Sequence, residues 1–83
     1  LDVRALSEHA AGAVPGATQL HGGRVLWNLD QLPSQGTVVT YCQSGLRSSV
    51  VANTLRHAGY DVVELEGSYA AWAAAQDTAV AAR

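Results

Sequence analysis

Apolar and polar residues fall into short blocks along the chain, and two of these blocks have the character of buried strands. Residues 37–42 (TVVTYC) are rich in β-branched and aromatic side chains, and residues 62–65 (VVEL) form the next such block. Shorter segments at residues 1–3 and 18–20 are compatible with brief strands. These blocks predict a small sheet.

Segments with helical spacing separate the strand-like blocks. Val51, Leu55 and Ala58 recur at i, i+4 and i+7 within residues 47–58, which places them on one helix face, toward a sheet. Further helices are predicted for residues 5–11, 25–32 and 68–75, and residues 76–83 are expected to form a frayed tail. Because strands alternate with helices, the pattern predicts an α/β fold with a mostly parallel central sheet flanked by helices.

Length and charge narrow the possible functions. The 83 residues suffice for a single domain, residues 1–83, with one modest core. A net charge of −2 without a basic stripe argues against nucleic acid as a partner, and no apolar run is long enough to cross a bilayer. The chain starts at Leu1 and contains no methionine, so we expect a fragment or module of a longer, cytoplasmic protein.

The chemistry-bearing side chains are few. Cys42 is the only cysteine, which excludes an internal disulfide and a multi-cysteine zinc site. The histidines lie far apart without the spacing of metal ligands; they are His9, His21 and His57. We therefore expect no metal site.

Cys42 stands where a strand is expected to end and a loop to lead into a helix. In parallel α/β sheets, ligands bind beyond the carboxyl ends of the strands. The loop, residues 43–46, can turn backbone N–H groups inward, with Gly45 allowing the tight bend, and the helix N-terminus adds positive charge. Arg47 can add a full charge. A lone cysteine is more often a buried structural residue, but this combination favours a reactive thiolate in an anion cradle.

Four segments of the chain resemble, in the same order, the motifs of the rhodanese-homology domain, a sulfurtransferase module. Asp2-Val3-Arg4 resembles the family's early DVR strand, and residues 8–17 (EHAAGAVPGA) resemble its E-x-x-x-G-H-I-P-G-A segment. Residues 42–47 (CQSGLR) fall at its active-site loop, and residues 66–72 (EGSYAAW) resemble its closing G-G-x-x-x-W segment. The resemblance implies a small three-layer rhodanese-like domain that lacks the family's first strand and helix.

Two positions depart from these family motifs. Ala13 stands where the family often has histidine, which removes a polar partner and costs local rigidity. Ser68 replaces the second glycine of the closing segment, a change that we expect the fold to tolerate.

The resemblance also implies a set of site residues and a mechanism that needs no metal and no organic cofactor. Cys42 would take the outer sulfur of a small anionic donor, thiosulfate or a thiol persulfide, and pass it to a thiol or to cyanide. Asp2 and Arg4 would support the loop structurally, and a fused or partner enzyme domain fits a module of this kind. The substrate-binding loop would comprise Gln43, Ser44, Gly45, Leu46, Arg47 and Ser48.

Two other functions remain open from the sequence. Cysteine phosphatases and arsenate reductases use a C-x5-R loop, whereas Cys42 and Arg47 form C-x4-R, one residue shorter. A smaller loop suits one sulfur atom better than a tetrahedral oxyanion. The second alternative is a non-catalytic docking or sulfur-relay module of a larger protein, although the presence of Cys42 argues against a purely inert role.

Overall fold

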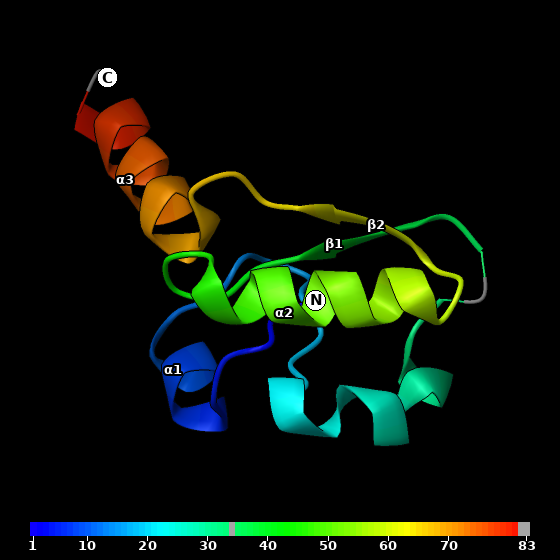
Figure 1. Ribbon diagram of the computed structural model, residues 1–83. Helices are drawn as coiled ribbons and strands as arrows, with labels where there is room; N and C mark the ends of the chain where they lie inside the picture. Colours follow the sequence, from blue (N-terminus) through cyan, green and yellow to red (C-terminus); the bar gives the residue numbers. More distant parts are fainter. Residues whose placement is uncertain (34, 82–83) are drawn as a thin grey trace.

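The computed structural model describes residues 1–33 and 35–81 (Figure 1). Two short 3-10 helices and three α-helices surround a small sheet. The elements in chain order are α1 (Leu6–Ala11), η1 (Gly22–Trp27), η2 (Leu29–Gln31), β1 (Thr37–Thr40), α2 (Leu46–His57), β2 (Asp61–Glu64) and α3 (Ser68–Ala81).

The sheet is parallel, as the alternation of strands and helices predicts. β1 and β2 pair in parallel, with Val38 opposite Val62, and α2 is the crossover between them. The brief strands expected at residues 1–3 and 18–20 contribute single parallel bridges, in which Asp2 pairs with both Tyr41 and Gln19. Segment 18–20 therefore lies beside segment 1–3, which lies beside β1. The α/β fold with a parallel sheet is confirmed.

The core lies between the sheet and α2. Val38 and Val62 point into it from the strands, and Val51 and Leu55 meet them from the helix, as their spacing predicts. Ala58, the third residue of that predicted stripe, is exposed because α2 ends at His57 and the chain turns there. Ala52 is buried in the helix instead. The cluster also contains Val3, Leu20, Val25, Leu32 and Cys42.

The second face of the sheet is covered mainly near the carboxyl ends of the strands. There, Tyr41 stacks on Tyr69 of α3, and its hydroxyl accepts the backbone N–H of Val14 at 3.1 Å. On the same face, Val39 and Val63, the third residues of β1 and β2, stand opposite one another and are about half-exposed. The outer layer on this side thus concentrates at the end of the sheet where Cys42 lies.

The predicted helix over residues 25–32 is wrong in type. The structure has η1 and η2 there, separated at Asn28, whose φ of −134° is not helical. Asn28 donates its side-chain N–H to the carbonyl of Arg24 at 2.9 Å, which offers the backbone an alternative to continuous helix. Two short turns still bury Val25 and Leu32, so the apolar spacing identified the core residues but not the helix.

The last helix is longer than the sequence predicts. α3 continues through residues 76–81, which were assigned to a frayed tail, and residues 82–83 lie outside the described residues. Alanine is the strongest helix former, so the Ala-rich sequence favours continuation of the helix. In the part of the chain that the structure describes, no helix has the length and apolar character needed to cross a membrane.

Candidate active site at Cys42

The Cys42 sulfur is enclosed by the loop that follows β1. Cys42 is 1% exposed, and the backbone N–H of Gly45 donates to its Sγ at 3.1 Å. The N–H of Ser48, in the first turn of α2, donates to the same atom at 3.4 Å, and the Ser48 hydroxyl oxygen lies 3.6 Å away. A single sulfur atom is thus held by donors from the loop and from a helix N-terminus.

The loop takes this shape because of one backbone conformation. Gly45 has φ of 114°, in the left-handed region that glycine adopts without a steric penalty, and α2 begins at the next residue. A Cβ on Gly45 would meet open space, so backbone conformation and not crowding requires glycine here. The turn directs successive N–H groups at Sγ, as a nest does for an anion.

These contacts favour the thiolate. Burial raises the pKa of the Cys42 thiol, but hydrogen bonds from the Ser48 N–H and hydroxyl, then from the N–H groups of Gly45 and Ser44, outweigh it. The net effect lowers the pKa from 9.0 to about 6. At neutral pH the sulfur is therefore mostly ionised, which makes it a nucleophile.

Ser68 supports the sulfur from a second segment, and the sequence motifs did not assign it this position. The Cys42 backbone N–H donates to the Ser68 hydroxyl oxygen at 2.9 Å, and that oxygen lies 3.9 Å from Sγ. Ser68 has φ of 56°, in the left-handed region, which favours glycine at this position. The buried hydroxyl of Ser68 ties the start of α3 to the end of β1.

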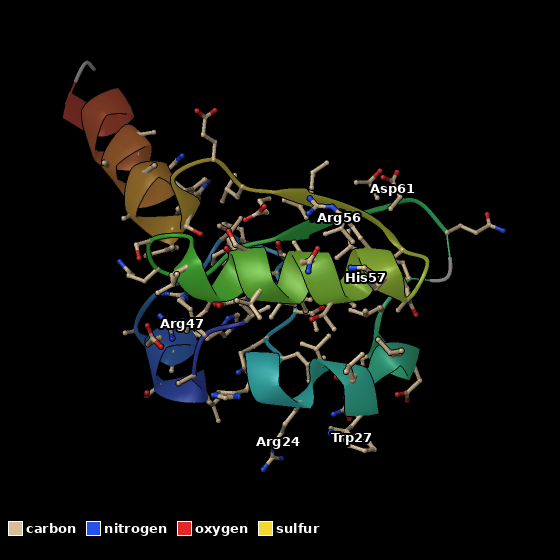
Figure 2. The ribbon with its side chains drawn as sticks, viewed as in Figure 1. Arg24, Trp27, Arg47, Arg56, His57 and Asp61 are labelled. Carbon is tan, nitrogen blue, oxygen red and sulfur yellow. The ribbon has the colours of Figure 1, made fainter. Side chains whose placement is uncertain are left out.

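Arg47 does not approach the sulfur as a free cation. Its Nη1 and Nη2 donate to Oε1 and Oε2 of Glu8 at 2.7 and 3.0 Å, so the guanidinium and the carboxylate form a bidentate pair. Figure 2 shows Arg47 directed from α2 toward α1, which carries Glu8. The sequence offered Glu8 only as the first residue of the segment 8–17. Nothing in its spacing pairs it with a residue 39 positions away.

Asp2 and Arg4 form a buried ion pair beneath the loop. Arg4 Nε and Nη2 donate to the two Asp2 carboxylate oxygens at 2.9 and 2.8 Å, and both side chains are at most 2% exposed. Burial raises the pKa of Asp2, but hydrogen bonds from Arg4 and His9 outweigh it and bring the pKa to about 2. Arg4 also donates to Gln43 Oε1 at 3.2 Å, which connects the pair to the loop.

Aromatic side chains enclose this ion pair. The Arg4 guanidinium lies 4.3 Å from the ring centroid of Tyr69 and 5.4 Å from that of Tyr41, and the Tyr41 hydroxyl donates to Asp2 at 3.1 Å. Trp72 packs against Tyr69 with ring centroids 5.7 Å apart. Because Tyr41 and Cys42 are neighbours in a strand, their side chains face opposite sides of the sheet, and this aromatic cluster supports the loop from behind.

An apolar hollow of about 350 Å³ adjoins the loop. Leu46 and Arg47 belong to both the loop and the hollow, and Val50, which is 65% exposed, continues its wall along α2. Cys42 does not line it. The hollow is completed by Val3, His21, Gly22, Gly23 and Val51.

The predicted loop residues thus divide by what their groups contact. The N–H groups of Gly45 and Ser48 donate hydrogen bonds to the sulfur, and the Ser44 N–H also lowers the pKa of the thiol. The side chain of Gln43 turns to Arg4, and that of Leu46 is exposed beside the hollow. Within residues 1–33 and 35–81, no three His, Cys, Asp or Glu side chains gather as metal ligands would.

Comparison with known proteins places this geometry in one family. The model of the rhodanese-like domain matches residues 1–75. A sulfurtransferase of Allochromatium vinosum is 36% identical over 88% of this chain and 69% of its own length. A rhodanese-like domain protein of Staphylococcus aureus is 32% identical, with a TM-score of 0.81 over 86% of this chain and 70% of that one.

A further structural relative has a different description. A Rhodopseudomonas palustris protein of unknown function, described as a possible tyrosine phosphatase, is 28% identical, with a TM-score of 0.80 over 90% of this chain and 64% of that one. Its fold agrees with that of the relatives above. The family model, the sequence identity and the fold together show that the chain belongs to the rhodanese-like domain family.

Proposed function

We propose that this domain is a sulfurtransferase that carries a sulfane sulfur on Cys42. The Cys42 thiolate attacks the outer sulfur of the donor, and a new S–S bond forms while the donor's own S–S bond breaks. The bonding electron pair leaves with sulfite when the donor is thiosulfate, or with the thiolate when it is a thiol persulfide. A thiol or cyanide then attacks the outer sulfur and restores the Cys42 thiolate.

The observation that carries the proposal is the set of donors around Sγ. The N–H groups of Gly45 and Ser48 contact the sulfur at 3.1 and 3.4 Å, and they lower the pKa of Cys42 together with the Ser48 hydroxyl. Such donors favour negative charge on a sulfur both before attack and in the persulfide anion that follows. The name of the Allochromatium vinosum relative, a sulfurtransferase, supports the same reaction class.

The proposal is tested by loading the protein with sulfur. The folded domain is incubated with thiosulfate or with glutathione persulfide, and its intact mass is measured. We expect the mass of one added sulfur atom, its loss on addition of cyanide or a thiol, and no loading of Cys42→Ser. Absence of the added sulfur with both donors would reject the sulfurtransferase.

A phosphatase is the second candidate, because one structural relative is described as a possible tyrosine phosphatase. Phosphate transfer needs a guanidinium free to clamp the phosphate oxygens. In this domain both terminal nitrogens of Arg47 are engaged by Glu8, and the loop is one residue shorter than C-x5-R. We therefore expect no turnover of an aryl phosphate; turnover that disappears in Cys42→Ser would favour the phosphatase.

A further inference from the structure

Both arginines that reach the Cys42 loop lie in ion pairs. Arg4 is paired with Asp2 beneath the loop, and Arg47 is paired with Glu8 at its outer side. The two pairs differ in accessibility, since the first is buried while Arg47 and Glu8 are 47% and 33% exposed. A substrate that enters the loop therefore meets a neutral pair instead of an isolated cation.

The carboxylate of Glu8 is held in place. Its Oε1 accepts the backbone N–H of Ala5 at 3.2 Å in the first turn of α1, in addition to the N–H of Arg47. A bidentate pair with a fixed partner uses one N–H on each terminal nitrogen of the guanidinium, and its carboxylate opposes the field of Arg47 at the loop, where Arg47 still interacts with Cys42. Arg47 also borders the apolar hollow, which offers a donor's carbon groups a place next to the start of α2.

We propose that Glu8, by neutralising Arg47, determines which donors the site prefers. The site then disfavours a dianion relative to a donor with one negative charge at its reacting end. This inference rests on the proposed sulfur transfer. Thiosulfate brings two charges to the loop, whereas an organic donor such as a thiol persulfide brings at most one to the reacting sulfur. Removing the charge of Glu8 should help the dianion more than the monoanion.

Two donors isolate the effect of charge. Thiosulfate and methanethiosulfonate both present a terminal sulfur bonded to a sulfonyl sulfur, but they carry two and one negative charges. Attack by Cys42 breaks that S–S bond in both cases and releases sulfite from the first and methanesulfinate from the second. The ratio of their second-order loading rates measures the preference, and it is insensitive to the fraction of protein that is folded.

Glu8→Gln keeps the size of the side chain and an oxygen for the Ala5 N–H while removing the charge. We expect the thiosulfate-to-methanethiosulfonate ratio to rise by about fivefold at low ionic strength, the size of effect typical of a charge near the protein surface. The rise should shrink as salt is added, because exposed charges are screened. The Arg47→Gln variant should lower the ratio, because it leaves the carboxylate of Glu8 without its cation beside the loop.

Asp30→Asn, a change of equal charge in η2, serves as the control for net charge and should leave the ratio unaltered. An unchanged ratio in Glu8→Gln or in Arg47→Gln, or an equal rise in Asp30→Asn, would overturn the role of Glu8 while leaving sulfur transfer intact. Failure of the wild-type domain to load sulfur from either donor would instead overturn the proposed function, and this inference with it.

Discussion

Two ion pairs flank the Cys42 loop, one on its inner side and one on its outer side. Asp2–Arg4 is buried and receives further hydrogen bonds from Tyr41, while Glu8–Arg47 is partly exposed on the surface. A buried pair cannot lose one member without leaving an uncompensated charge, whereas an exposed pair is solvated either way. A carboxylate–guanidinium pair thus stabilises the fold on the inner side of the loop, whereas on the outer side the same kind of pair is accessible to a ligand.

Breaking the inner pair should have the largest effect. We expect Arg4→Ala to lower the free energy of unfolding by about 3 kcal/mol or more, because it leaves the charge of Asp2 buried without its cation. Urea denaturation followed by tryptophan fluorescence measures the change. Arg56→Ala removes an arginine from an exposed pair with Glu64, and its effect should stay within about 1 kcal/mol. Equal losses in the two variants would contradict the difference between buried and exposed pairs.

The loop between the two pairs can be disturbed through its backbone. Gly45→Ala forces a left-handed conformation on a residue with a Cβ, which should cost about 1–2 kcal/mol and draw the Gly45 N–H away from Sγ. The pKa of Cys42 should then rise. Gly36→Ala is the matched control, since Gly36 has φ of 88° and equally open space at its Cβ but lies away from the loop. It should cost similar stability, and a rise in the pKa of Cys42 there would refute the assignment.

The pH dependence of Cys42 alkylation measures how far the surrounding hydrogen-bond donors stabilise the thiolate. Alkylation of Cys42 by iodoacetamide should reach half its maximal rate near pH 6, and Ser48→Ala should move this midpoint upward. A midpoint at the value of a free thiol, about 8.5, would show that the cradle does not stabilise the thiolate.

The lowered pKa of Cys42 also links folding to pH. Between about pH 6 and pH 9 the unfolded chain binds more protons at Cys42 than the folded one, so this contribution to stability rises with pH. It is complete above the unfolded pKa and is lost as the pH falls through the folded pKa. Cys42→Ser should remove that part of the pH dependence.

Breaking the outer pair should have the smallest effect on stability. We expect Glu8→Gln to change the free energy of unfolding by at most about 1 kcal/mol, since both side chains are partly exposed. Its effect on donor preference should nevertheless be measurable, as described above. A stability loss as large as that of Arg4→Ala would place the outer pair in the same structural class as the inner one.

The sequence was most informative where chemistry depends on neighbours along the chain. An apolar β-branched strand, then Cys42, then a glycine-bearing loop and a helix were enough to predict a parallel α/β fold with a thiol at a strand end. Helical spacing identified Val51 and Leu55 as core residues. It failed over residues 25–32, because a 3-10 turn and an α-helix can bury the same two residues, and the side chain of Asn28 decided between them.

Only the tertiary structure determined which charged side chains form ion pairs with one another. Sequence determined that Arg47 follows Cys42 at the start of a helix, but it left open whether that guanidinium is free. The fold brings Glu8 of α1 to it from 39 positions away. In the same way, Ser68 meets Cys42 only because β2 returns the chain to the same end of the sheet. Local backbone preferences and hydrophobic spacing act over a few residues, whereas ion pairs between distant segments exist only once burial of the common core has fixed where those segments lie.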